Sequence, residues 1–402
     1  MMAGELEIIA PQSEQELSEL VAGAMRKQTP LEIIGAGSRK GYGNPVAATS
    51  QVSTRAISGI TLYEPAALTI VARAGTPLDE IREVLAAEGQ HLPFEPADWS
   101  QLLANETRPT IGGTVATGIS GPRRIQAGAV RDSLIGVRFV DGTGAITKNG
   151  GRVMKNVTGY DLVKLMCGSQ GTLGILTEMS FKVLPMPRKT ATLTLDGLDD
   201  KRAMEALSMA LGSPFDITGA AHFAQSGDTI IRIEGFADSV AYRCNELTRL
   251  LAPFGPAEIN DDPTVNQQLW QSVRDCTEFS GKPGAIWRIS LKPSDGPKLV
   301  AGLRTKMPLE AIYDWGGGLV WLLVAEEGDC GAGAIRSAVA ATGGHATLVR
   351  ASDAMRSTIG VFQPEAAAVA AISSALRSRF DPAGILNPGR MYAPTNAMRK
   401  AG

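Results

Sequence analysis

The chain contains 402 residues, of which 44% are hydrophobic and 20% charged, and its formal net charge is −2. These values are typical of a globular protein with two or three domains, and the near-neutral charge argues against a general nucleic-acid binder. Four widely separated cysteines show no C-x-x-C spacing, which favours a reducing compartment and excludes a cysteine-ligated zinc or iron–sulfur site in this chain. We therefore predict a cytoplasmic protein without a signal peptide, which contacts a membrane only through partners.

The sequence of the first half of the chain predicts helices separated by short strands. Ser13 and Glu16 form a capping box for a helix over 13–27. Thr76 and Pro77 have the residue types of an N-cap and a first helical position, so they predict the start of a second helix. Strands are predicted at 31–34, 68–74, 134–140, 145–148 and 173–184, and the Asp-Gly-Thr-Gly turn after 140 indicates a hairpin.

A proline-rich connector, Pro185–Arg188, marks a domain boundary. Beyond it, two rounds of strand–helix–strand–strand–helix predict an α+β domain on one antiparallel sheet, with helices on one face. The predicted strands are 190–195, 217–223, 229–235, 286–291, 311–315, 319–325 and 345–350, and the predicted helices are 199–211, 238–252, 264–276, 297–306 and 332–342. An alanine-rich helix over 364–380 then leads into a tail rich in turn residues, Asp381–Gly389.

Three clusters of glycine and small hydroxyl residues lie at 35–43, 112–121 and 155–176. Glycines at such density allow main-chain N–H groups to approach a large ligand closely. The first cluster follows a strand but fails the G-x-G-x-x-G fingerprint, because Lys40 stands at the third glycine position. Ordinary glycine turns, and for the second cluster a small-residue helix packed on a sheet, are the structural alternatives. Together the three clusters predict one extended, phosphate-bearing cofactor.

These clusters, with GYDL at 159–162, GSQGTLGI at 168–175 and the Asp381–Gly389 tail, resemble the FAD-linked oxidase family typified by vanillyl-alcohol oxidase and the D-lactate dehydrogenases. The resemblance covers 1–187 and 375–392, and within the family it is most similar to the FAD-binding E subunits of bacterial glycolate oxidases. It implies an α+β fold with a PCMH-type FAD-binding domain of two α+β subdomains over 1–187. A cap domain on an antiparallel sheet would span 188–374, and 375–402 would return to the FAD domain.

The resemblance also implies which residues hold FAD. The diphosphate would lie on Gly35, Ala36, Gly37, Ser38 and Arg39. The flavin and its sugar chain would contact Gly112, Gly113, Thr114, Thr117 and Gly118, with Pro96 beside the flavin. The adenine side would be closed by Gly168, Ser169, Gly171, Thr172, Gly174 and Ile175, and Asn387 would return from the tail. Some relatives attach FAD covalently through a histidine in the first loop. This loop has none, so we expect non-covalent FAD.

Catalytic relatives supply histidines, often as a metal-binding cluster, whereas this chain has only His91, His222 and His345. A lone histidine is more often structural than catalytic, so we assign neither a catalytic residue nor a metal ligand. The second domain holds Arg274, Arg288 and Arg350, which are either carboxylate anchors or part of a solvated surface. Its four tryptophans, Trp270, Trp287, Trp315 and Trp321, are interpreted as core residues, with a hydrophobic docking face as the alternative.

The resemblance implies the FAD-binding subunit of a glycolate oxidase, which relays electrons or supports assembly of the complex. Its expected partners are a second FAD-containing subunit that carries the substrate histidines and an iron–sulfur subunit. A self-sufficient FAD-dependent 2-hydroxy-acid dehydrogenase is one alternative. A non-catalytic interaction subunit that has lost FAD is the other, although its glycine clusters would then be expected to have acquired ordinary side chains.

Overall fold

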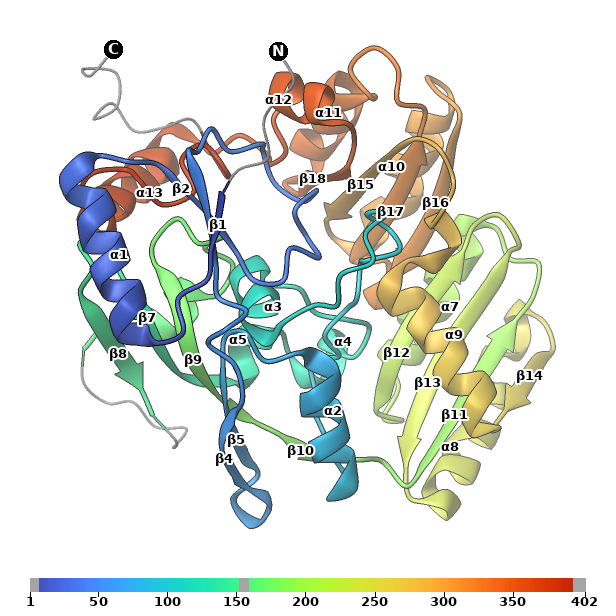
Figure 1. Cartoon of the computed structure of the whole chain (residues 1–402). Coiled ribbons are helices and arrows are strands. Elements are labelled where there is room, and N and C mark those ends of the chain that lie inside the picture. Colours follow the sequence, from blue (N-terminus) through green and yellow to red (C-terminus); the bar gives the residue numbers. More distant parts are fainter. Residues whose placement is uncertain (1–6, 152–158, 393–402) are drawn as a thin grey trace. The chain divides into compact units, whose positions relative to one another are not determined.

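The structure, a computed structural model, describes residues 7–151 and 159–392 (Figure 1). It divides into two compact units. The first unit comprises Met1–Ile119, Ala129–Pro185 and Pro364–Gly402, and the second comprises Ser120–Gly128 and Met186–Gln363. The short excursion at 120–128, which leaves the first unit and joins the second, has no counterpart in the predicted domain boundaries at 187 and 374.

The first unit contains a parallel sheet and an antiparallel sheet. The parallel sheet has the order β1-β3-β2 and the antiparallel sheet the order β4-β5-β9-β7-β8, while β6 and β10 form a two-stranded ribbon. The bounds are β1 (Glu7–Ile9), β2 (Leu31–Ile34), β3 (Ser50–Ser53), β4 (Ile60–Glu64), β5 (Thr69–Arg73), β6 (Gln90–His91), β7 (Leu134–Val140), β8 (Ile146–Gly150), β9 (Ile175–Lys182) and β10 (Leu184–Pro185). Because β7 and β8 pair antiparallel across a tight turn, the predicted hairpin is confirmed.

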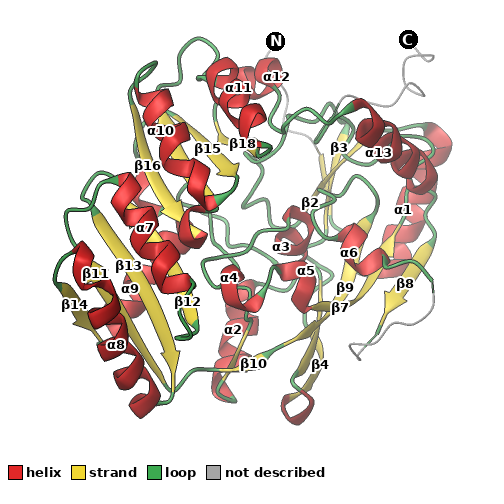
Figure 2. Ribbon diagram, turned by 180° about the vertical axis from the view of Figure 1, so that it is seen from behind, coloured by secondary structure: helices red, strands yellow, loops and turns green. Residues whose placement is uncertain are grey.

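The helices of the first unit pack on these sheets (Figure 2). They are α1 (Glu14–Lys27), α2 (Leu78–Ala87), α3 (Ile111–Thr117), α5 (Val130–Ser133), α6 (Leu162–Met166) and α13 (Ala367–Phe380). The Ser13 hydroxyl caps α1 as predicted, by accepting from the Glu16 N–H at 3.1 Å. The other half of the predicted capping box differs, because the Glu16 carboxylate accepts from the Gln12 N–H at 2.8 Å and not from the Ser13 N–H. The N-cap prediction for Thr76 is wrong, because Pro77 occupies that position. The Thr76 hydroxyl instead donates to Arg73 O at 2.7 Å and accepts from the Gly59 N–H at 2.9 Å.

Two hydrophobic clusters hold the first unit together. In one, Leu17 and Val21 of α1 pack with Leu31 of β2 and Ile385 of the tail. In the other, α2 and α3 pack against the apolar faces of β5, β7 and β9. The tail lies parallel to β2, since the Leu31 N–H donates to Ile385 O at 2.8 Å and the Asn387 N–H donates to Leu31 O at 3.0 Å. Main-chain bonding thus anchors the tail beside the strand that precedes the first glycine cluster.

Glu14, in the first turn of α1, contacts two adjacent strands of the antiparallel sheet, β7 and β9. Its carboxylate accepts from Arg138 of β7 and, at 2.5 Å, from the Thr177 hydroxyl of β9. Burial alone would raise the pKa of Glu14, but the hydrogen bonds from Arg138 and Thr177 outweigh it and hold the pKa below its usual value of 4.5. A carboxyl group whose pKa is lower in the folded state than in the unfolded state stabilises the fold at any pH above its unfolded-state pKa. This stabilisation is lost as the pH falls through the folded-state pKa.

We therefore expect Glu14→Gln to lower the melting temperature at neutral pH. The difference from the parent protein should shrink as the pH falls through 4.5 and vanish near full protonation of Glu14. Thermal unfolding followed by circular dichroism from about pH 7 down to about pH 3 measures this. A difference that stays constant over the whole range would contradict the assignment.

The second unit is built on one eight-stranded antiparallel sheet, as predicted, with the order β14-β11-β13-β12-β16-β17-β15-β18. Its strands are β11 (Lys189–Leu195), β12 (Ile217–Phe223), β13 (Asp228–Gly235), β14 (Ala257–Asn260), β15 (Ala285–Ser290), β16 (Leu309–Asp314), β17 (Leu319–Val324) and β18 (His345–Arg350). The sequence did not predict β14, a short strand at the edge of the sheet.

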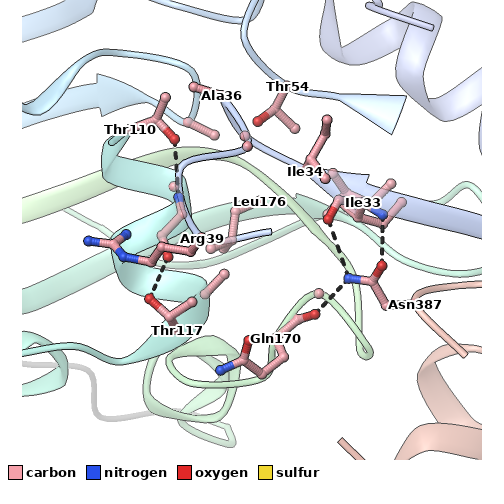
Figure 3. A pocket seen from close by; sticks show the side chains of 18 of the residues that line it. Ile33, Ile34, Ala36, Arg39, Thr54, Thr110, Thr117, Gln170, Leu176 and Asn387 are labelled. Carbon is pink, nitrogen blue, oxygen red and sulfur yellow. Dashed lines mark hydrogen bonds between the residues drawn. The ribbon is translucent and has the colours of Figure 1, made fainter. Parts of the chain in front are cut away.

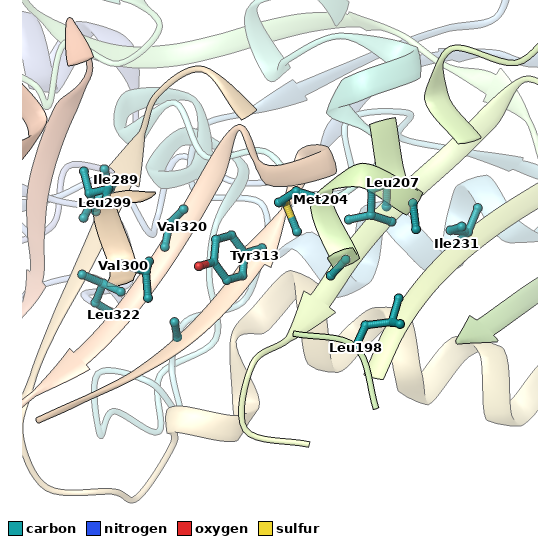
Figure 4. Packing of buried hydrophobic residues seen from close by; sticks show 14 of the residues in the cluster. Leu198, Met204, Leu207, Ile231, Ile289, Leu299, Val300, Tyr313, Val320 and Leu322 are labelled. Atoms are coloured by element: carbon teal, nitrogen blue, oxygen red, sulfur yellow. The ribbon is translucent and has the colours of Figure 1, made fainter. Parts of the chain in front are cut away.

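Helices cover both faces of this sheet. Residues of α7 (Asp200–Leu211), α8 (Ala237–Leu251), α10 (Gly296–Arg304) and α11 (Ala332–Thr342) share the main core with alternate strand residues such as Ile231 (Figure 4). On the other face, Trp270 of α9 (Pro263–Asp275) packs with Ile230, the neighbour of Ile231 in β13. The prediction of helices on one face is therefore wrong for α9. Two shorter helices are α4 (Arg124–Ala127) and α12 (Asp353–Ile359).

The four tryptophans named above and His222 are structural residues of the second unit. Trp270, Trp287, Trp315 and Trp321 are each less than a tenth exposed, which confirms the core interpretation and leaves no tryptophan docking face. His222 is fully buried, with Nδ1 at 3.0 Å from the Thr229 hydroxyl, so its structural interpretation is also confirmed. Within 7–151 and 159–392, no helix combines the length and apolarity that crossing a bilayer requires.

Candidate cofactor site

The first unit contains a cavity with an empty volume of about 750 Å³, including the part open to solvent. Its lining comes from β2 and the following loop, from α3, from the segment before β9, and from the tail. The structure thus brings together residues from all three glycine clusters. The predicted residues that line the cavity are Gly35, Ala36, Gly37, Ser38, Arg39, Gly112, Gly113, Thr117, Gly171, Gly174, Ile175 and Asn387.

The loop after β2 has its carbonyl groups bonded to protein and its N–H groups available. Gly35 O accepts from the Ser53 hydroxyl at 2.8 Å, Ala36 O from Arg55 at 3.4 Å, and Gly37 O from the Asn105 amide at 3.0 Å. The N–H groups of residues 36, 37 and 38 have no acceptor within the part of the chain that the structure describes. Successive available N–H groups form a nest that binds anions, and a diphosphate is an anion of that kind.

Arg39 places a positive charge beside this nest. Arg39 is only 9% exposed, and its guanidinium donates to Ala97 O at 2.6 Å and to the Thr114 hydroxyl at 3.2 Å. Both contacts fix the orientation of the side chain, and Lys40 adds a second cation to the cavity lining. The loop therefore offers both N–H donors and positive charge to a phosphorylated ligand.

Helix α3 carries residues with two different roles. A Cβ on Gly112 would lie 2.7 Å from Ala74 O, so this glycine allows α3 to pack directly on the chain that follows β5. Gly112 is therefore explained by the structural alternative for the second cluster, a helix of small residues packed on a sheet. Gly113 and Thr117 line the cavity, and the Thr117 hydroxyl donates back to Gly113 O at 2.7 Å. One turn of helix thus supports the sheet with one side and forms a cavity wall with the other.

Asn387 joins three segments of the cavity wall (Figure 3). Its side-chain oxygen accepts from the Ile33 N–H at 2.7 Å, and its amide nitrogen donates to Gln170 O at 2.7 Å. The residue is 3% exposed, and its backbone has a positive φ of 44°. The side chain of Asn387 therefore positions β2 relative to the segment before β9.

Six predicted residues do not line the cavity; they are Pro96, Thr114, Gly118, Gly168, Ser169 and Thr172. Thr114 lies behind the wall, where its hydroxyl contacts Arg39. A Cβ on Gly118 would lie 3.3 Å from the Cα of Gly168, so these two glycines allow two main-chain segments to pack together. The Ser169 hydroxyl is buried and has no hydrogen-bond partner among the described residues. Residues 152–158, which begin the third cluster, lie outside the described residues.

The cavity also contains residues that sequence reasoning missed. They are Ile33, Ile34, Lys40, Tyr42, Thr54, Ala74, Thr110, Ala116, Gln170, Leu176 and Arg390. Gln170 lies inside the GSQGTLGI motif and Thr110 stands two residues before the second cluster, so a wider reading of those motifs would have included both. Arg390 carried no signal, because a single basic residue near the end of a chain is usually solvated.

The residues present fit a long, phosphate-bearing cofactor. The N–H groups of the first loop and the charge of Arg39 suit a diphosphate, and Gly113 and Thr117 leave room for a flat ligand close to the main chain. Comparison with known proteins identifies the family. The glycolate oxidase subunit GlcE of Escherichia coli is 38% identical over 380 residues, which cover 94% of this chain and 97% of that protein. The chain belongs to the GlcE family of FAD-linked oxidoreductases.

Other similarities agree with this family. A family model described as an FAD binding domain matches residues 6–150. The glycolate oxidase subunit GlcD of Bacillus subtilis is 33% identical over 188 residues, 46% of this chain and 38% of that protein. Alkyldihydroxyacetonephosphate synthase has the same fold, with a TM-score of 0.68, 17% identity, and coverage of 95% of this chain and 75% of that one. The predicted family, α+β fold and FAD cofactor are confirmed.

Proposed function

We propose that this chain is the FAD-binding subunit of a glycolate oxidase complex that converts glycolate to glyoxylate, with the first unit holding FAD non-covalently in the cavity described above. The observation that carries the proposal is the N–H nest at 36–38 in a chain whose similarity to GlcE extends over 94% of its length. When bound, the flavin of FAD accepts a hydride equivalent and passes electrons onward. The chain's own residues supply the binding, through the loop after β2, α3 and Asn387.

We further propose that this chain relays electrons or supports assembly and does not itself abstract hydride from the substrate. Hydride abstraction from a 2-hydroxy acid needs a base at the hydroxyl group. Of the three histidines, His222 is fully buried against Thr229 and Asp200, which removes it from any substrate. In this proposal a second FAD-containing subunit supplies the substrate base and an iron–sulfur subunit accepts the electrons. The four free cysteines are compatible with the cytoplasm as the place of assembly.

The purified chain, alone and then co-expressed with its partner subunits, tests this function. We expect the chain alone to carry a flavin absorbance band, to release FAD on acid precipitation, and to keep its flavin oxidised when glycolate is added without oxygen. The assembled complex should bleach under the same conditions. Rapid bleaching of the isolated chain would instead establish the self-sufficient dehydrogenase. A colourless chain that still assembles would establish the interaction subunit without FAD.

A further inference from the structure

The helix layer of the second unit contains a groove between α10 and α11, which lie beside each other (Figure 2). The empty volume of the groove is about 1210 Å³, including the part open to solvent. Its described lining includes three lysines, Lys292, Lys298 and Lys306, and one carboxylate, that of Asp295. Small and apolar residues of the two helices lie between these charges.

The lysines give the groove an excess of positive charge. Lys292, Lys298 and Lys306 are exposed, and none of them forms an ion pair within residues 7–151 and 159–392. Arg304 of the same helix differs, because its guanidinium lies 2.6 Å from the Asp200 carboxylate. The three lysine charges are therefore available to an acidic partner, although the whole chain has a net charge of −2.

Gly302 provides a second, independent observation at the same groove. It lies inside α10 and lines the groove, although a glycine within a helix is less stable than an alanine there. A Cβ built on Gly302 meets no atom of the described chain within 4 Å, so packing inside the protein does not require this glycine. Ala338 and Ala341 of α11 keep the groove shallow-walled as well. A segment that approaches the main chain of α10 closely would explain these residue types.

The composition of the groove favours a protein partner over a nucleic acid. None of the described residues that line it is arginine or aromatic, and those are the residue types that commonly hold phosphates and stacked bases. Lys298 and Lys306 are eight positions apart, which corresponds to about 12 Å along a helix axis. Carboxylates spaced along a second helix, with small apolar residues between them, match both the charges and the floor of the groove.

We propose that the groove between α10 and α11 is a docking surface for an acidic helix of a partner protein. The carboxylates of that helix pair with Lys298 and Lys306, and its main chain lies against Gly302. The groove shares no lining residue with the cofactor cavity, so the proposal does not rest on the proposed function. A chain that failed to bind FAD would still be expected to bind the acidic helix.

A fluorescently labelled helical peptide of repeated Glu-Ala-Ala-Ala units is the probe, titrated with the full-length protein and followed by fluorescence anisotropy. We expect saturable binding that weakens as the salt concentration rises, because the pairing charges are exposed. The corresponding Lys-Ala-Ala-Ala peptide should not bind. Lys298→Glu and Lys306→Glu should each weaken binding of the acidic peptide by about fivefold or more, because like charges then face each other. Lys27→Glu is the matched control, since Lys27 is an exposed lysine at the end of α1 in the first unit.

Gly302→Gln tests the close approach separately from the charges. Glutamine is a better helix former than glycine, so the variant should fold, and its side chain should fill the groove floor and weaken peptide binding by about fivefold or more. Unchanged affinity in Gly302→Gln would overturn the placement of the helix in this groove.

The remaining outcomes separate the docking surface from general anion attraction. Peptide affinity that is unchanged in both Lys298→Glu and Lys306→Glu would overturn the proposal, as would an equal loss in Lys27→Glu. Absence of saturable binding up to about 1 mM peptide would also overturn it. Inorganic phosphate that displaces the peptide at equal concentration would identify a small-anion site instead, and a single-stranded oligonucleotide that binds more tightly through the same lysines would identify a nucleic-acid surface.

Discussion

Gly37→Ala is expected to abolish FAD binding while leaving the fold intact. Gly37 has a positive φ of 88°, and a Cβ built on it meets no atom of the described protein within 4 Å. The added methyl group would therefore enter the cavity beside the N–H nest, where we propose that the diphosphate lies. We expect FAD affinity to fall by at least about a hundredfold, because the main chain could no longer approach the phosphate oxygens closely.

The same substitution also strains the backbone, so a matched control is needed. Gly59 lies in the same unit outside the cavity lining, with a positive φ of 108° and equally open space around a built Cβ. Each alanine variant should lose about 1–2 kcal/mol of stability from the left-handed conformation alone. Isothermal titration of flavin-free protein with FAD separates the two effects. Equal FAD affinity in both variants would contradict the placement of the diphosphate on this loop.

The sequence predicted the regular elements well where the pattern was long and local. Helix α1 was recognisable from its Ser13 cap and its apolar spacing, and seven of the eight strands of the second unit's sheet from strand-like runs between helices. Short elements were missed because few residues carry their pattern. Helix α3 has seven residues, two of them glycine, and entered only as the structural alternative for the second cluster, whereas β14, with four residues at a sheet edge, was not predicted at all. Tertiary contacts of Trp270 determine on which face of the sheet α9 packs, and a local sequence pattern cannot predict such contacts.

For the site, glycine and small hydroxyl residues were informative because close approach to the main chain restricts residue type. The same signal could not distinguish two reasons for that restriction. Gly37 borders open cavity space, whereas Gly112 is required by the packing of α3 on the chain after β5. Polar residues that act in pairs from distant positions gave no signal at all. Glu32 and Arg390 are 358 positions apart, and only the folded tail brings them together.

That buried pair is the basis of a second large expected effect. Arg390 Nη2 lies 2.6 Å from a carboxylate oxygen of Glu32, and the two side chains are 6% and 7% exposed. The other Glu32 oxygen accepts from the Gln51 amide at 2.6 Å, and Arg390 Nη1 donates to Asn44 O at 3.2 Å. The pair thus links the tail to β2, to β3 and to the loop after the first glycine cluster.

Arg390→Met should lower the free energy of unfolding of the flavin-free protein by about 3–5 kcal/mol, because it leaves the Glu32 carboxylate buried without its cation. Arg108→Met is the matched control in the same unit, where Arg108 pairs with Asp79 at 77% exposure and should contribute less than about 1 kcal/mol. Glu32→Gln combined with Arg390→Met should recover part of the loss, since both charges are then removed. Urea unfolding of the four proteins measures these differences. If Arg390→Met loses no more unfolding free energy than Arg108→Met, this ion pair does not hold the tail. The cavity wall that Arg390 helps to form would then depend on Asn387 and on the main-chain bonds to β2.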